Sequence, residues 1–265
     1  MSEYAVPPVE RAFKVLRYVG SGQSCANISR ASKELQINRT TLLRLLSTLT
    51  SEGMLQSVGE GAGYRLGTGL ITLAGQALFS RDIVQVAQPA LRDVARQLGL
   101  SAHLAIMEGA DIVYLLRETP DLSLVSNVRV GSHLPAHATT IGRIILAQLH
   151  EDELRAHIAT WQLDAVTEKT STTPDALIAQ VKADRDLGIA WSTGNYEPGI
   201  GSAAVAVFDR SGSAVGAINV TGPEADFRVE SGRRPEIETA LKAVAASISQ
   251  QLGHFPRGKL ATGTN

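Results

Sequence analysis

Residues 27–67, NISRASKELQINRTTLLRLLSTLTSEGMLQSVGEGAGYRLG, predict a short helix, a tight turn, a second helix and a glycine-rich hairpin. Asn27 and Asn38 each stand where a side-chain oxygen caps the helix that follows. The second helix starts at Arg39, and its leucines recur at the spacing of one buried face: Leu42, Leu45, Leu46 and Leu49. Gly53 ends this helix. The segment is therefore predicted to be a winged helix-turn-helix, with the hairpin as its wing.

The opposite face of the second helix has residue types that read DNA. At 100° per residue, this face carries Thr40, Leu43, Arg44 and Ser47, and Arg39 and Thr41 flank it in the first turn. Hydroxyl and guanidinium groups hydrogen-bond to bases and phosphates, and an apolar side chain contacts the thymine methyl group. Arg39 and Arg44 can bind guanine or contact phosphate, and the sequence leaves both roles open. We expect this helix to enter the major groove.

Length and composition describe a soluble protein of two ordinary domains. The 265 residues are 44% hydrophobic and 19% charged, which allows two separate cores and is not typical of a disordered chain. The net charge of −1 is unevenly distributed. Residues 1–66 hold eight Lys or Arg against five Asp or Glu, a net charge of +3 that leaves −4 for the remainder. A positive domain on a mildly acidic body favours a sequence-selective DNA-binding protein.

The cysteine count and the hydropathy of the chain argue against disulfide-rich, zinc-binding, secreted and membrane-spanning proteins. A single cysteine, Cys25, excludes an internal disulfide framework and a cysteine-rich zinc site. The sequence has neither a signal-peptide pattern nor an apolar run of membrane-spanning length. We therefore expect a cytoplasmic protein that makes no membrane contact.

Periodicity and composition divide the chain into three ordered parts and a tail. Residues 1–67 form the predicted DNA-binding domain, in which an apolar helical stripe from Val9 to Val19 precedes the helix-turn-helix. Residues 68–80 form a linker helix. Residues 81–253 form the second domain, and residues 254–265 form a polar tail that is predicted to be disordered.

The second domain is predicted to be α+β. A helix from Ile83 to Leu98 comes first, and the other elements follow in the order of three strands, three helices, three strands and a closing helix: 102–107, 112–117, 122–130, 139–149, 151–159, 174–187, 189–193, 203–208, 214–221 and 235–252. This order implies an antiparallel sheet covered by helices. A cup between the sheet and the central helices is a place where a small molecule can bind.

Six short strings, in their order and spacing, resemble the IclR-type transcriptional regulators, and the likeness runs from about Val9 to Leu252. In the first domain the strings are VERAFKVL at 9–16, NRTTLLRLL at 38–46 and GYRLG at 63–67. In the second domain they are LPAHATTIGR at 134–143, YEPG at 196–199 and AINVTGP at 217–223. The resemblance implies a winged helix-turn-helix joined to an effector domain similar to a GAF domain. We expect a transcriptional regulator that acts as a repressor.

The resemblance also implies the partners. These are double-stranded operator DNA, expected to be palindromic, a small organic acid as effector, and a second copy or three further copies of the chain in a homodimer or homotetramer. The recognition-helix motif of the family falls on Arg39, Thr40, Thr41, Leu43 and Arg44. Helical geometry independently selects nearly the same set. Arg65 in the wing is expected to contact phosphate or sugar. The alternative is that Arg65 only solvates the hairpin.

The resemblance implies that seven residues of the second domain form an effector pocket: Thr140, Ile141, Ser192, Ile200, Ser202, Asn219 and Thr221. The start of the helix after His137 offers free N–H groups and a positive dipole end, which suit a carboxylate. Asn219 and Thr221 are two residues apart, so they point to the same face of a strand. With Ser202 they would place an amide and two hydroxyls around an otherwise apolar wall.

Three positions depart from the family pattern. Gly201 and Ser202 stand where an Arg and a Cys are common, and Asn219 stands where a Ser is usual. Ser202 removes the thiol, so neither thiol-based redox sensing nor a thiolate–metal site is expected. The missing cation at position 201 puts in doubt any scheme in which an arginine clamps the ligand. It also leaves open whether the acid is aromatic or aliphatic.

Catalytic and metal chemistry find less support in the sequence. It has no Gly-x-Ser-x-Gly nucleophile elbow, and Gly59, Gly61 and Gly63 lie at a hairpin tip and not between a strand and a helix. We therefore expect neither an enzyme nor a cofactor. A metal site would need three histidines to converge, His103, His133 and His137, and we expect none because His137 more simply packs against its helix. Glu197 either orients a loop over the pocket or is only solvated.

The working hypothesis is an allosteric switch, in which the effector changes the arrangement of the linker helices and with it the half-site spacing that a dimer matches. Two functions of other classes remain open beside it. One is a constitutive DNA-binding protein whose second domain only oligomerises. The other is an enzyme whose second domain turns over a small acid.

Overall fold

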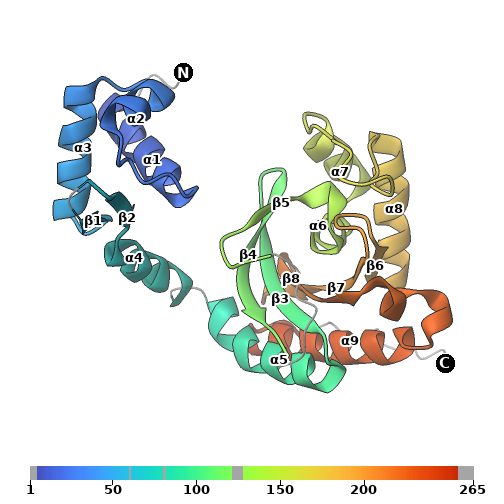
Figure 1. The fold of residues 1–265 in the computed structure, drawn as a ribbon. Coiled ribbons are helices and arrows are strands. Elements are labelled where there is room, and N and C mark those ends of the chain that lie inside the picture. Colours follow the sequence, from blue (N-terminus) through green and yellow to red (C-terminus); the bar gives the residue numbers. More distant parts are fainter. Residues whose placement is uncertain (1–4, 60, 80–81, 121–127, 256–265) are drawn as a thin grey trace, which may run out of the picture. The chain divides into compact units, whose positions relative to one another are not determined.

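The computed structural model describes residues 5–59, 61–79, 82–120 and 128–255, and the chain forms two compact units, Met1–Ser80 and Arg81–Asn265. The first is a helix-turn-helix with a two-stranded wing, and the second is an antiparallel sheet with helices on both faces (Figure 1). The predicted α+β class is confirmed. Most of the tail for which we predict disorder, from residue 256 onward, lies outside the described residues. None of the helices in the described part of the chain is long and apolar enough to cross a membrane.

The first unit is built from three helices, a hairpin and a further helix: α1 (Pro7–Gly20), α2 (Ile28–Leu35), α3 (Arg39–Ser51), β1 (Leu55–Gly59), β2 (Gly63–Leu66) and α4 (Thr68–Phe79). Both predicted caps are confirmed, because Asn27 Oδ1 accepts the N–H of Arg30 at 3.0 Å and Asn38 Oδ1 accepts the N–H of Thr41 at 2.8 Å. Of the four leucines predicted to be buried, three are, and Leu45 is half-buried.

The wing is fixed to the turn that precedes α2 by a close backbone approach. The N–H of Tyr64 donates to the carbonyl oxygen of Ser24 at 2.6 Å. Gly63 has a φ of +89°, and a Cβ there would lie 2.1 Å from the same oxygen. A side chain at this position would therefore push the wing away from the helices.

The second unit is a six-stranded antiparallel sheet in the order β5-β4-β3-β8-β7-β6. Its strands are β3 (Ser101–Glu108), β4 (Asp111–Glu118), β5 (His133–Pro135), β6 (Ala190–Thr193), β7 (Ile200–Phe208) and β8 (Ala214–Pro223). Helices α5 (Asp82–Leu98) and α9 (Arg234–Gln251) cover one face. The other face carries α6 (Thr140–Leu146), with α7 (Glu151–Ile158) and α8 (Pro174–Leu187) beyond it (Figure 1).

Two predicted elements of this unit differ from the structure. The strand expected at 122–130 falls largely outside the described residues, and Val128–Val130 is not a strand. The strand that pairs with β4 is β5, in which Leu134 lies opposite Ile112. The helix expected over 139–149 ends at Leu146, because the N–H of Leu149 bonds three residues back to Leu146 and tightens the last turn.

Helix α6 lies unusually close to the short 3-10 helix before it, Ala136–Ala138. A Cβ on Gly142 would lie 2.1 Å from the carbonyl oxygen of Ala136. The absence of a side chain at this position therefore lets α6 sit directly on the segment that leads into it. This contact fixes where the first turn of α6 meets the sheet.

We predict that Gly142→Ala lowers the free energy of unfolding of the second unit by about 2 kcal/mol or more, because the added methyl group overlaps backbone that has no room to move. The matched control is Gly75→Ala in α4, where a Cβ meets nothing within 4 Å. That change is expected to be neutral or to stabilise the helix by up to about 1 kcal/mol. Urea denaturation of the two variants measures both effects, and equal stabilities would contradict the steric argument.

Candidate functional site

The first candidate surface is the outer face of α3. Arg39, Thr40, Leu43 and Arg44 are exposed, and Thr41, whose N–H donates to the Asn38 cap, is half-buried. Leu43 is 45% exposed although the leucines before and after it in the helical turn pack into the core. All five predicted residues thus lie together around one exposed end and face of the helix, with an apolar side chain among polar ones.

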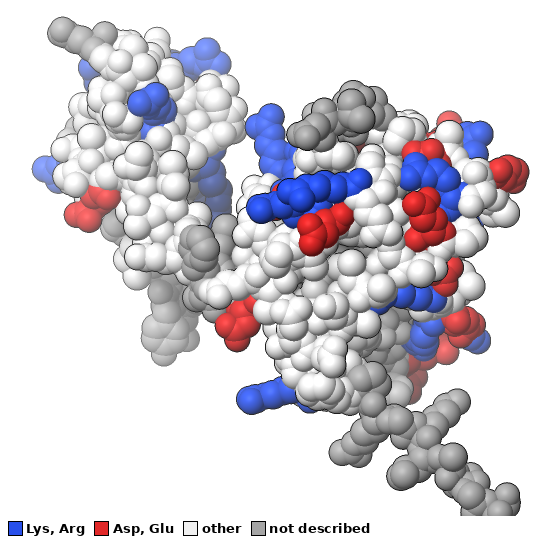
Figure 2. All heavy atoms as spheres, turned by 90° about the horizontal axis from the view of Figure 1, so that it is seen from below, with Lys and Arg blue, Asp and Glu red and all other residues white. Residues whose placement is uncertain are grey.

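The arginines of this unit differ in their surroundings. Among the described residues, neither Arg39 nor Arg44 takes part in an ion pair, so both guanidinium groups are available to a ligand. Arg65 is held across the wing, where its Nε and Nη2 donate to Gln56 Oε1 at 3.1 and 3.0 Å. On the face drawn in Figure 2, this unit displays more basic than acidic side chains. Such a surface attracts a polyanion.

The second candidate site is a small cavity of about 40 Å³ between the sheet and α6. Its lining comes from five strands, the segment that leads into and begins α6, and two connecting segments: Tyr114, Val128, Leu134, Ala138, Thr139, Thr140, Ser192, Tyr196, Glu197, Ile200, Ser202, Asn219 and Thr221. Six of the seven predicted residues therefore lie together. Ile141 does not line the cavity, because its side chain is fully buried in the core cluster beneath α6.

Strand register explains why the polar side chains converge. Ser202 of β7 lies opposite Thr221 of β8, and Asn219 lies opposite His103 of β3. Side chains of directly opposed residues share a face of an antiparallel sheet. In this case that face is the one covered by α6, so the strands present a polar patch inside an apolar layer.

Three hydrogen bonds connect this patch across the sheet to α6. His103 Nδ1 lies 3.0 Å from Asn219 Oδ1, Asn219 Nδ2 donates to Ser202 Oγ at 3.1 Å, and Ser202 Oγ lies 2.7 Å from Thr140 Oγ1. Because the amide oxygen of Asn219 is an acceptor, Nδ1 of His103 carries the proton. Among the described residues, His103 Nε2 and Thr221 Oγ1 are buried without a partner.

The imidazole of His103 is neutral at neutral pH. The side chain is fully buried and packs edge-on against Tyr114. Burial lowers the pKa of His103 to about 4, against a smaller raising effect of the bond to Asn219. The three histidines weighed as a metal site do not converge: His137 Nε2 lies 3.0 Å from the carbonyl oxygen of Asp164, and His133 is exposed beside Glu108.

The structure changes two expectations about the protein groups that would balance the charge of a bound acid. The start of α6 is less open than expected, because Thr139 Oγ1 accepts the N–H of Gly142 at 3.1 Å. Position 201 points away from the cavity, since a Cβ on Gly201 would lie 2.3 Å from the ring of Phe227 on the opposite face of the sheet. The residue type at 201 therefore does not decide which charges surround the cavity.

A loop closes the cavity on one side. It runs between two glycines of positive φ, Gly194 and Gly199, and it contributes Tyr196 and Glu197 to the lining. Ser192 Oγ donates to Asn195 Oδ1 at 2.9 Å, so this predicted pocket residue holds the base of the loop. Pockets that bind organic molecules measure roughly 300–1,000 Å³. A ligand larger than a few atoms therefore has to displace the loop.

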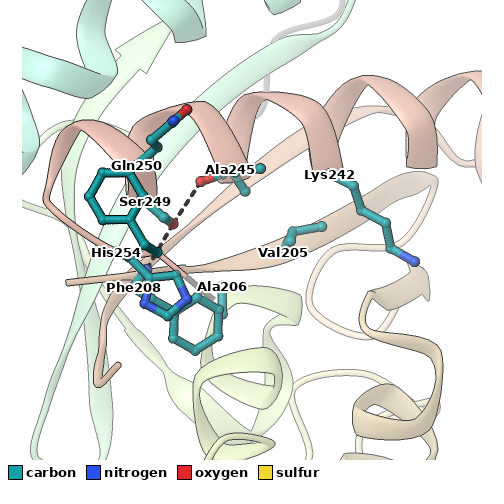
Figure 3. Close-up of a pocket in the computed structure, with 10 residues that line it drawn as sticks. Val205, Ala206, Phe208, Lys242, Ala245, Ser249, Gln250 and His254 are labelled. Atoms are coloured by element: carbon teal, nitrogen blue, oxygen red, sulfur yellow. Dashed lines mark hydrogen bonds between the residues drawn. The ribbon is translucent and has the colours of Figure 1, made fainter. Parts of the chain in front are cut away.

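A larger groove of about 460 Å³, which the sequence did not predict, lies beside β7 and α9 (Figure 3). Its lining is mostly apolar, and three of its polar side chains, those of Lys242, Ser249 and His254, already have partners within the protein. Ser249 Oγ accepts the N–H of Phe208 at 3.0 Å, and Lys242 Nζ donates to Glu238 at 2.6 Å. The smaller cavity is the better candidate because several hydroxyl and amide groups converge there, among them the hydroxyl of Thr221, which has no partner among the described residues.

Comparison with known proteins gives two matching family models that together cover most of the chain. The model described as "IclR helix-turn-helix domain" matches residues 8–59. The model described as "Bacterial transcriptional regulator IclR C-terminal" matches residues 75–250. Both candidate sites lie within these ranges.

Similar proteins of known name or structure are regulators. The HTH-type transcriptional regulator XynR of Escherichia coli (strain K12) is 28% identical, with 94% of this chain and 98% of XynR covered. The HTH-type transcriptional repressor AllR of the same strain is 27% identical, with 92% and 90% covered. An IclR homologue from Microbacterium hydrocarbonoxydans, crystallised with 4-hydroxybenzoate, has the same fold, with a TM-score of 0.79, 24% identity and coverage of 92% and 98%.

We predict that the second unit loses about 2–3 kcal/mol of stability between pH 7 and pH 4.5 through His103. The pKa is lower in the folded protein than in the unfolded chain, so this stability is present above about pH 6.5 and falls as the unfolded chain takes up the proton. His103→Gln removes this part of the pH dependence. His157→Gln, a change of an exposed histidine, retains it. Urea denaturation at several pH values compares the three proteins, and identical pH profiles would contradict the assignment.

Proposed function

Since the chain belongs to the IclR family of bacterial transcriptional regulators, we propose that it is a repressor whose affinity for its operator is modulated by a small organic acid. The acid binds in the cavity beneath α6. Two helix-turn-helix domains, in a homodimer or homotetramer, bind the half-sites of a palindromic operator.

Support for the DNA-reading residues comes from α3 and the wing. Arg39, Thr40 and Arg44 are exposed on a helix whose other face is anchored in the core, so the protein backbone can position them rigidly in a groove. Arg65 keeps N–H groups beyond those that bind Gln56, and these suit a phosphate or sugar contact. Thr41 and Leu43 complete the proposed surface.

The observation that carries effector binding is the convergence of buried polar groups on one cavity. Thr140, Ser202 and Asn219 are joined by hydrogen bonds, and Thr221 adds a buried hydroxyl without a partner among the described residues. Ser192 and Ile200 line the same space. A ligand hydroxyl or carboxylate that bonds to these groups would satisfy them. The relative crystallised with 4-hydroxybenzoate supports an organic acid as the ligand class.

Regulation requires the acid to bind two states of the protein with different affinity. In the structure the cavity is closed by the loop between Gly194 and Gly199 and holds about 40 Å³. The acid therefore favours a state in which this loop has moved. We propose that the loop state is coupled through the linker helix α4 to the half-site spacing that the dimer accepts.

Arg44→Ala is expected to weaken binding to the DNA upstream of the protein's own gene by about tenfold or more, because it removes a base or phosphate contact. Arg96→Ala, which removes an exposed positive charge from the second unit, serves as the matched control and should leave the affinity unchanged. Fluorescence anisotropy titrations at fixed salt compare the variants. Full affinity in Arg44→Ala would refute the proposed DNA-binding face.

Ser202→Leu is expected to abolish the effect of the acid on operator affinity while leaving binding without the acid intact. The leucine fills the cavity and breaks the bonds to Asn219 and Thr140. Ser247→Leu, an exposed position on α9, is the control. The readout is the anisotropy titration repeated with a panel of small organic acids that includes 4-hydroxybenzoate. If none of the acids changes the operator affinity of the wild-type protein, the protein behaves as a constitutive DNA-binding oligomer.

A further inference from the structure

A polar stripe crosses the buried face of the sheet at the level of the cavity. Its members are Arg117 on β4, His103 on β3 and Asn219 on β8, because His103 lies opposite Arg117 on one side and opposite Asn219 on the other. The three strands are neighbours in the sheet (Figure 1). Residues directly opposite one another on neighbouring antiparallel strands have their side chains on the same face of the sheet. The three side chains therefore lie on the face that α6 covers.

Arg117 stands directly behind the cavity wall. Its Nη1 donates to the carbonyl oxygen of Val128 at 2.5 Å, and Val128 lines the cavity. Its other near neighbour, His103, packs against Tyr114, which also lines the cavity. The guanidinium group is therefore separated from a bound ligand by a single layer of side chains.

The charge of Arg117 is not balanced within the described part of the chain. The side chain is half-buried, its Nε is buried without a hydrogen-bond partner there, and it forms no ion pair with a described carboxylate. Arg143 shows the contrast, because its buried guanidinium is paired with Asp184 at 2.8 Å. Because Nε of Arg117 is buried, the positive charge without a counter-ion is costly even though the side chain is half-buried. A negatively charged ligand in the adjacent cavity would remove that cost.

The other groups around the cavity do not supply a competing positive charge. His103 is neutral at neutral pH, and its burial and the field of Arg117 both disfavour protonation. Among the lining residues the ionisable carboxylate is Glu197, which lies on the loop and is partly open to solvent. Glu197 and Arg117 are both half-buried, and Glu197 lies on the loop that a larger ligand displaces.

We propose that Arg117 makes the cavity selective for anions, so that the effector binds as a carboxylate and its neutral analogues bind weakly. This inference rests on the proposed effector function of the same cavity. Arg117 acts through its field across the layer of Val128, Tyr114 and His103, as a specificity-determining residue. Loss of a full charge behind one layer of side chains, in a medium of effective dielectric constant about 20, is expected to change the affinity for an anion by about tenfold.

The test compares acids with their amides, which have similar size and no charge. The probes are formate, acetate, benzoate and 4-hydroxybenzoate, each paired with its amide, and calorimetric titration of the full-length protein measures the affinities at constant ionic strength. Formate and acetate are included because they are small enough for a closed cavity. In the wild-type protein, any acid that binds is expected to bind at least tenfold more tightly than its amide.

Arg117→Gln is expected to lower the affinity for the acid by about tenfold while leaving the affinity for the amide unchanged. Arg117→Lys, which keeps the charge, should preserve most of the preference. Arg129→Gln removes an exposed positive charge nearby and should change neither affinity. Operator binding without ligand verifies that each variant is folded.

The possible failures are distinguishable. Equal affinities for acids and amides, or a preference for acids that survives in Arg117→Gln, would overturn the role of Arg117 while the effector function stands. Binding of neither acids nor amides, or binding that leaves operator affinity unchanged, would overturn the proposed function itself and this inference with it.

Discussion

The second unit depends on the antiparallel pairing of β3 with β8, which joins segments more than 100 residues apart in the chain. The hydrogen bond between His103 and Asn219 spans 116 positions of sequence. This pairing connects the first half of the sheet with the second half and positions β8, whose Asn219 and Thr221 line the cavity. Closing a loop of this length costs conformational entropy. Apolar residues buried on both faces of these two strands offset that cost.

The same pairing places unfavourable groups at the centre of the unit. A neutral histidine, an amide and several hydroxyls occupy a layer that apolar residues would fill more stably, and two of these groups lack partners among the described residues. A sheet face shaped by stability alone would not retain them. Ligand recognition gives a physical reason for their presence, because the amide and the hydroxyls line the cavity and the histidine holds the amide in place.

The helix-turn-helix was predictable from sequence because its determinants are local. Asn27 and Asn38 cap helices within three residues of themselves, and the leucine spacing of α3 fixes which face is buried. The six cavity residues were predicted through family resemblance, and their convergence then followed from strand pairing. Ile141 was misplaced because a helix start does not reveal which of two adjacent side chains turns inward. The strand expected at 122–130 was wrong where the structure describes it, since an apolar run does not reveal which segment pairs with β4.

The sequence by itself determined the two-domain order and selected six of the thirteen residues that surround the cavity, because periodicity, caps and short motifs act over a few residues. The DNA-binding face on α3 stays a prediction of the same kind. Tertiary structure decided which charges face the cavity. Gly201, where an arginine was thought to matter, points to Phe227 on the far side of the sheet, while Arg117 shares the near side with His103. Side chains alternate between the two faces of a strand, so a shift of one residue in register exchanges the faces. Register is set by partners distant in the chain, and that information does not reside in any single strand.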